Sequence, residues 1–410
     1  MTKSATPYYG WVIVGAAFLV LAVSYGMIFS YGVYLPELQK SLGEGAAIAT
    51  LPFSCCVAVY CTLSLVTGRI VDAVGPRPVV IAGAALLAIG FWGMSVAWES
   101  WHVFVAFGLV TGAGMSAAYI PMTSTVVKWF EARRGLALGI ASQGLSASTV
   151  IGPVITAAMI AALGWREAAL AIGLGGSAFI ALCGLTLRRE PSSGSGNRAS
   201  NAAVEGTELT GYSLKQACKT RPFWLLVVLF WLSWCVLFFP YAHLPNLAAD
   251  HGYDPISAAA LLGAMGVGGA AGRIVFGPLS DRIGRQRAVQ LAILFQIVAC
   301  TILPSTGEYW LLYAAAALFG SGSGAAITLF PAIVGDLFGP RHVGAISGLI
   351  FALTGSAGAL GPYAAAAIRE ATGSFDLAFW IGAGFNTVSL FLVFALTRPR
   401  QLVEPAAGTA

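Results

Sequence analysis

Charged side chains are scarce in this chain, and their scarcity decides the class of protein. Asp, Glu, Lys and Arg make up only 10% of the 410 residues, whereas 58% of the residues are hydrophobic and the mean hydropathy is +0.81. A soluble domain of this length typically has about a quarter of its residues charged. We therefore expect an integral protein that crosses a lipid bilayer many times.

The sequence also lacks the groups on which several functions depend. Its seven cysteines are odd in number and have no metal-ligand spacing, so we interpret them as free thiols. No Asp or Glu falls within an apolar run, which leaves a membrane enzyme without an acid–base pair. No polar stretch is long enough to form the output domain of a membrane sensor. Neither a cofactor nor a metal nor an obligate protein partner is indicated.

Long apolar runs are what the chain has in abundance. They predict twelve transmembrane helices, each long enough at the helical rise to cross the hydrocarbon core. We expect no cleavable signal, because Met1–Pro7 is short and polar and the first run, Gly10–Leu35, is too long for a signal-peptide core. The predicted spans are residues 10–36, 46–68, 78–97, 101–127, 135–163, 165–187, 222–249, 255–278, 286–306, 308–335, 342–369 and 374–397.

One polar segment divides the chain. Residues 188–221 are rich in Ser, Gly and Asn and predict a flexible cytoplasmic linker with one amphipathic turn near its end. The linker separates an N-terminal six-helix half, residues 1–187, from a C-terminal six-helix half, residues 222–410.

The distribution of Lys and Arg predicts the orientation. Of the 22 such residues, all except Lys40, Arg166, Arg369 and Arg273 fall on the side that holds both termini and the linker. The positive-inside rule therefore predicts a multi-pass protein of the cell inner (plasma) membrane with both termini in the cytoplasm. Because the cations behind the net charge of +5 lie in short loops beside the bilayer, we do not expect a nucleic-acid partner.

The two halves resemble each other in sequence. Residues 209 positions apart match repeatedly: Gly68, Asp72 and Gly75 correspond to Gly277, Asp281 and Gly284, and the pair at 152–153 (Gly-Pro) corresponds to the pair at 361–362. A constant offset over this length predicts duplicated halves with the same orientation in the membrane.

Four stretches resemble a known transporter family. The segments 68–77 (GRIVDAVGPR) and 277–287 (GPLSDRIGRQR) resemble the signature loops of the major facilitator superfamily. Residues 8–15 (YYGWVIVG) and 128–139 (KWFEARRGLALG) resemble its monocarboxylate transporters and their oxalate–formate antiporter relatives. The resemblance implies an all-α integral membrane fold of twelve helices in two six-helix halves. It also places Arg273 where this branch has its substrate-binding arginine.

Arg273 is the single charge that lies more than three residues from either end of a predicted span. Its counterpart in the first half is Ser64, so the arginine breaks the symmetry of the repeat. A guanidinium presents a fork of donors that matches a carboxylate, which favours an anionic cargo. The alternative is snorkelling, because Arg273 lies near the end of its predicted span and could reach the headgroups.

Further residues are candidates for the substrate pocket, although packing is the alternative for each. His243, at the end of the seventh span, is either a structural hydrogen-bonder or a titrating or gating group. Tyr119 stands two residues before Pro121 in the fourth span. The other candidates are apolar or hydroxyl side chains within spans: Tyr25, Ile28, Phe29, Leu145, Thr328 and Phe330.

Three residues are candidates for gating. The family resemblance implies that Asp72 contacts the start of the eleventh span and Asp281 the start of the fifth, where Arg134 also lies. A carboxylate at a helix N-terminus is favourable, so the two contacts would bias the cytoplasmic side toward closure. The alternative is that both aspartates are solvated loop charges.

The predicted function is transport of small monocarboxylates, such as lactate or pyruvate, by alternating access and together with a proton. A single cation suits a single carboxylate. The alternative is an organic-anion exchanger, oxalate/formate-like, without proton coupling. Proton-linked members of the branch carry an acid four residues before the arginine and a lysine in the first span, and those positions are Gly269 and Phe29 here.

Overall fold

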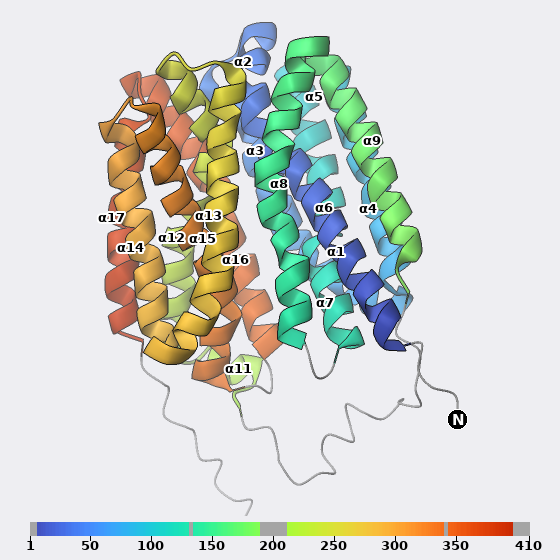
Figure 1. Cartoon of the computed structure of the whole chain (residues 1–410), viewed down its shortest axis with the longest axis vertical. Coiled ribbons are helices and arrows are strands. Elements are labelled where there is room, and N and C mark those ends of the chain that lie inside the picture. Colours follow the sequence, from blue (N-terminus) through green and yellow to red (C-terminus); the bar gives the residue numbers. More distant parts are fainter. Residues whose placement is uncertain (1–5, 131–133, 189–210, 340–342, 397–410) are drawn as a thin grey trace, which may run out of the picture.

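The computed structural model describes residues 6–130, 134–188, 211–339 and 343–396. These ranges form a bundle of long helices that run along one axis (Figure 1). Twelve segments within them are helical, long and apolar enough to cross a membrane. The predicted spans are thus confirmed to within a few residues at most of their ends.

The N-terminal half contains the first six crossings. The first crossing consists of two helices and the fourth of four short pieces, whereas each of the others is one helix. The elements are α1 (Thr6–Phe29), α2 (Tyr31–Leu42), α3 (Ala46–Val74), α4 (Pro76–Ser95), α5 (Ser100–Val103), the π-helix η1 (Phe104–Thr111), α6 (Gly112–Met115), α7 (Tyr119–Trp129), α8 (Arg134–Leu163) and α9 (Trp165–Thr186).

The C-terminal half repeats this arrangement. The short helix α11 (Leu214–Ala217) precedes it, at the position where the sequence predicts an amphipathic turn. Its six crossings are α12 (Arg221–Asp250), α13 (Pro255–Ile283), α14 (Arg285–Ile302) with the 3₁₀ turn η2 (Leu303–Ser305), α15 (Tyr309–Phe338), α16 (Val343–Thr372) and α17 (Asp376–Phe394).

The segments 68–77 and 277–287, which resemble the signature loops, are largely helical. The helix α3 continues to Val74 and α13 to Ile283, and one glycine makes each turn. Gly75 has φ +92° and Gly284 has φ +91°, a left-handed conformation that only glycine adopts readily. Two consecutive helices can therefore meet at a single residue.

The first and fourth crossings are interrupted by identifiable side chains. At the break between α1 and α2 the Ser30 hydroxyl donates to the Gly26 carbonyl, 2.6 Å away. Pro36 lies farther along, inside α2, which continues past it. In η1 the Thr111 hydroxyl donates to the Ala106 carbonyl five residues earlier. The break before α7 coincides with Pro121, which again removes a helical donor.

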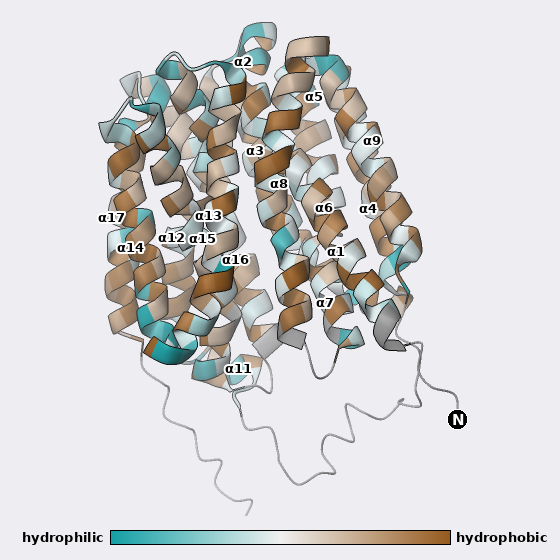
Figure 2. Ribbon diagram, in the orientation of Figure 1, coloured by the Kyte–Doolittle hydropathy of each residue, from teal (hydrophilic) through white to brown (hydrophobic). Residues whose placement is uncertain are grey.

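The outer helices turn large apolar side chains outward. Figure 2 shows hydrophobic residues along the length of the bundle and hydrophilic residues mainly at its two ends. This pattern is that of a surface surrounded by lipid. Exposed examples from α4, α9 and α17 are Trp92, Leu182, Phe391 and Phe394.

Three pairs of helices join the halves: α8 packs on α13, α3 packs on α16, and α2 packs on α12. We call these contacts the seam. We call the end of the bundle that holds residues 43–45 and 251–254 the distal end, and the end that holds α11 the linker end; they are the top and bottom of Figure 1.

The seam is tight on the distal side and loosens toward the linker end. A Cβ atom added at Gly266 of α13 would lie 2.7 Å from the Ser146 carbonyl oxygen of α8, and one at Gly355 of α16 would lie 2.6 Å from Cys61 Cβ of α3. At Gly277 and at Gly139, nearer the linker end, an added Cβ would meet nothing within 4 Å. The halves therefore touch backbone to backbone only along part of their length.

We predict that Gly268→Ala destabilises the protein. The new Cβ would collide with the Ala317 carbonyl oxygen, which is backbone, so α13 and α15 must move apart. Overpacking of this kind costs about 1–3 kcal/mol. Gly384→Ala is the matched control, since nothing lies within 4 Å of its added Cβ. The melting temperature in detergent should fall for the first variant and not for the second; equal values would contradict the prediction.

Candidate functional site

Arg273 lies well inside the bundle. It belongs to α13, ten residues before that helix ends, and its side chain is half-buried. Its Nη1 donates a hydrogen bond to the Ser146 hydroxyl of α8, across the seam. The helix α13 ends at Ile283, five residues later than the predicted span. Arg273 is therefore farther from the end of its helix than the snorkelling alternative assumes, and this disfavours that alternative.

Three phenol groups lie in the neighbourhood of the guanidinium. Arg273 interacts electrostatically with the side chains of Tyr25 from α1, Tyr119 from α7 and Tyr241 from α12. In the part of the chain that the structure describes, no carboxylate forms an ion pair with Arg273. The described groups that interact with the positive charge are therefore hydroxyls, and a hydroxyl can donate a hydrogen bond to an anion.

Further aromatic rings pack against those of Tyr25 and Tyr241. The ring of Phe29 stacks on that of Tyr241, with 3.9 Å between centroids and 16° between planes. Tyr25 lies beside Phe29, and its ring also contacts Tyr60 edge-on. The stack joins α1 of one half to α12 of the other, so it belongs both to the wall of the site and to the junction of the halves.

Tyr119 also lies between the halves. Its ring is nearly parallel to that of Phe351 in α16, at 6.5 Å between centroids. Phe351 in turn contacts Trp234 of α12 edge-on. Arg273 therefore interacts with phenols from both halves, Tyr25 and Tyr119 of the N-terminal half and Tyr241 of the C-terminal half.

Two other residues predicted to contact the substrate are apolar and buried, and each is adjacent in sequence to a residue described above. Ile28 has no exposed surface, and it lies between Met27 and Phe29 in α1. Leu145 is 7% exposed and directly precedes Ser146, the partner of Arg273. Both therefore stand next to a residue of the site, and their contact with a substrate stays a prediction.

Thr328 and Phe330 have contacts inside the C-terminal half. The Thr328 hydroxyl donates to the Gly324 carbonyl one turn earlier in α15, and the side chain is exposed. Phe330 is buried and packs edge-on against Phe230 of α12. Neither of these contacts involves Arg273.

His243 is buried between α12 and α16. Its Nε2 lies 2.8 Å from the Pro362 carbonyl oxygen, which can only accept, so Nε2 carries a proton that it donates. The imidazole ring also packs against Phe375. This geometry fits the structural alternative, a histidine that joins two helices of one half.

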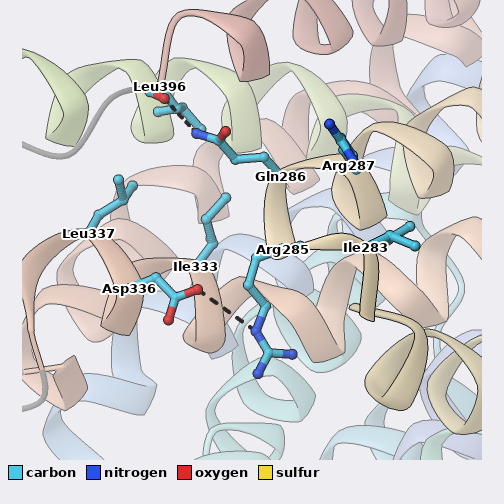
Figure 3. Close-up of a pocket in the computed structure, with 9 residues that line it drawn as sticks. Ile283, Arg285, Gln286, Arg287, Ile333, Asp336, Leu337 and Leu396 are labelled. Carbon is cyan, nitrogen blue, oxygen red and sulfur yellow. Dashed lines mark hydrogen bonds and ion pairs between the residues drawn. The ribbon is translucent and has the colours of Figure 1, made fainter. Parts of the chain in front are cut away.

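The gating candidates lie at the linker end. Asp281 pairs with Arg285 at 2.7 Å, and Arg285 Nε lies 3.8 Å from Asp336 of α15 (Figure 3). The carboxylate of Asp281 is thus engaged within its own half. The side chains of Asp72 and Arg134 lie outside the described residues.

A cavity of about 480 Å³ opens beside this ion pair. Gln286 donates to the Leu396 carbonyl at its rim, as Figure 3 shows, and so ties the start of α14 to the end of α17. The cavity lies on one half only. It is separate in sequence and position from the groups around Arg273.

Sequence reasoning missed Ser146 and Tyr241. Both are hydroxyl side chains in apolar runs, and their counterparts across the repeat are Gly355 and Gly32. The loss of symmetry that singled out Arg273 was therefore present at these two positions as well.

Comparison with known proteins identifies the family. The model of the Major Facilitator Superfamily matches residues 17–309 and 274–410. The chain belongs to the Major Facilitator Superfamily. Among curated members, Monocarboxylate transporter 11 of Mus musculus is 29% identical over 400 residues, which cover 95% of this chain and 88% of that protein. Monocarboxylate transporter 13 of Rattus norvegicus is 28% identical over 414 residues, covering 98% and 94%.

A solved structure supports the same fold. A mutant of the nucleoside transporter NupG matches this facilitator chain with a TM-score of 0.74, over 95% of this chain and 99% of the other, at 14% sequence identity. The family and the fold predicted from the sequence are thus confirmed, and the relatives are named as transporters rather than enzymes.

We predict that Ser146→Ala weakens anion binding by about threefold to tenfold. The substitution removes the acceptor that orients Arg273, and a hydrogen bond to a charged group contributes about 1.5–3 kcal/mol, part of which water replaces. Ser148→Ala is the matched control, because its hydroxyl donates only to the Leu145 carbonyl of its own helix. Calorimetric titration with lactate would measure both. An unchanged or higher affinity in Ser146→Ala would show that Ser146 does not orient the guanidinium.

Proposed function

We propose that this protein carries small monocarboxylate anions, such as lactate or pyruvate, across the cell inner membrane by alternating access. The observation that carries the proposal is the guanidinium of Arg273, which has a hydroxyl partner and three phenols around it but no described carboxylate. A charge in this position needs an anion, and the simplest anion is the cargo.

The number of cations favours a monocarboxylate. Arg273 has no second base beside it among the described residues, and the groups with which it interacts are neutral hydroxyls. One carboxylate neutralises one guanidinium in a bidentate pair. The phenols supply further hydrogen bonds, which would suit a hydroxyl or keto oxygen next to the carboxylate.

The seam supports the alternating-access part of the proposal. The halves are in close contact on the distal side of Arg273, and their contacts thin out on the linker side. With the linker end in the cytoplasm, this arrangement corresponds to a carrier closed to the outside. Opening at the distal end would require the stack of Phe29 on Tyr241 to separate.

Proton coupling belongs to the proposal, with exchange as the alternative. Arg273 and a bound carboxylate form a neutral pair. A proton that travels with the anion would allow this pair to separate and the carrier to return to its starting state. His243 donates to the Pro362 carbonyl, so its ring has a structural partner. Exchange is favoured by the apolar residues at the two usual proton positions, where Phe29 is used for stacking and Gly269 has no side chain.

We predict that Arg273→Lys weakens lactate binding by about tenfold or more. The ammonium keeps the charge but loses the planar fork of donors, and each tenfold step corresponds to about 1.4 kcal/mol. Arg287→Lys, an exposed residue of α14, is the matched control. Counterflow of labelled lactate in proteoliposomes, with formate, oxalate and an amino acid as competitors, measures both. If a folded Arg273→Lys carrier bound lactate with the wild-type affinity, the proposal would be wrong.

We further predict that lactate uptake acidifies the lumen of proteoliposomes. Pyranine trapped inside reports the proton, and His243→Gln separates two routes, because the glutamine amide can still donate to the Pro362 carbonyl. If the proton travels with the anion, this variant keeps the wild-type pH profile; a shifted profile would assign the proton to His243. Uptake with no proton signal would instead favour the exchanger.

A further inference from the structure

The helix α3 begins without a cap of its own. The residue before it, Gly45, has no side chain that could accept from the free N–H groups of the first turn. The acceptor comes from the other half instead. Oε1 of Glu370, in the last turn of α16, lies 2.9 Å from the Ala47 backbone nitrogen.

The equivalent helix of the other half caps itself. Asp254 stands before α13, at the position that corresponds to Gly45, and its Oδ1 accepts from the Ile256 and Ser257 N–H groups. Hydrogen bonds from the side chain and then the backbone of Ser257 hold the pKa of Asp254 below its usual value. The counterpart of Glu370 is Ala161, which has no carboxylate. One half thus has a local cap, and the other has a cap supplied across the seam.

Gly45 also makes room for this contact. Its backbone is extended, with φ −69° and ψ 164°, so the conformation itself does not require glycine. A Cβ atom at this position would, however, collide with the Glu370 carboxylate. The absence of a side chain at residue 45 therefore both removes a local cap and admits the distant one.

Neighbouring contacts hold Glu370 in place. The adjacent Arg369 pairs with Asp250 of α12 at 2.6 Å, and its guanidinium lies over the ring of Phe375. This fixes the end of α16 within its own half. On the other side, Ala46 and Ala47 of α3 pack against Ala366 of α16. The end of α16 is thus fixed within its own half, and it holds the Glu370 carboxylate against the start of α3 in the opposite half.

We propose that Glu370 is a latch between the halves, which caps α3 only while the distal end is closed. When the distal end opens, α3 loses its cap and α13 keeps its own. The stabilisation by the cap therefore belongs to one conformation alone and biases the empty carrier toward it. The inference rests on the alternating-access part of the proposed function and does not depend on the cargo.

Two pairs of spin labels would follow the two ends. In the full-length carrier with its seven cysteines replaced, one pair sits at the distal end, at Lys40→Cys and Glu308→Cys, and the other at the linker end, at Arg77→Cys and Arg287→Cys. All four positions are exposed. Pulsed electron double resonance without substrate then gives the distance distribution at each end, so the result does not depend on what is transported.

Glu370→Ala should raise the ratio of distal-open to distal-closed carrier by about threefold to tenfold, the range expected for loss of a side-chain cap. At the linker end, the ratio of carriers with the short distance to carriers with the long distance should rise by the same factor. Glu44→Gln is the matched control, because it removes the carboxylate next to Gly45 and leaves the hydrogen bond from the Ala47 N–H to Glu370 in place. Unchanged distances at both ends in Glu370→Ala would overturn the proposal.

Gly45→Asp tests the same latch while Glu370 remains in place. The aspartate should cap α3 as Asp254 caps α13, and its Cβ should displace the Glu370 carboxylate, so the distal end should open without loss of helix stability. In this background Glu370→Ala should have no further effect. An additional shift of the same size as in the parent would show that Glu370 acts by something other than capping, and would also overturn the proposal.

Discussion

A guanidinium held among membrane helices is the constraint on which the rest of this structure depends. Insertion of an isolated arginine at the centre of a helix costs about 2.5–3.5 kcal/mol. Here Arg273 donates to the Ser146 hydroxyl, and phenols from three other helices interact with it electrostatically. These groups come from both halves of the bundle, so the halves must approach each other for the charge to be solvated by protein.

The site and the junction of the halves share residues. Tyr241 interacts with Arg273 through its phenol and stacks its ring on Phe29 of the other half. Ser146 lies in the seam and accepts from Arg273. Any ligand that engages these groups changes contacts that also hold the halves together. Binding and conformational change are therefore linked by common side chains, as a shift in population between states requires.

The sequence predicted the crossings, the repeat and the family, because the length of apolar runs and the offset of 209 residues can be read from the order of the residues alone. It did not predict the helical breaks at Ser30 and in η1, which depend on hydroxyl groups bonding to particular carbonyls. The sequence also predicted that Arg273 has no acidic partner within the membrane spans. The partner Ser146 was not, because only the packing of α8 on α13 brings the two together.

The glycine-rich seam has a consequence for the cost of moving the halves. Closing an interface lined by long side chains freezes their rotamers, at about 0.5–2 kcal/mol for each residue. At Gly266 of α13 and Gly32 of α2 the other half approaches with a backbone carbonyl, that of Ser146 and that of Ala242, and these groups have no side-chain rotamers to lose. At these two points, opening and closing therefore change the side-chain entropy little. The balance between the two states is left to a few specific contacts, so single substitutions at those contacts can shift it measurably.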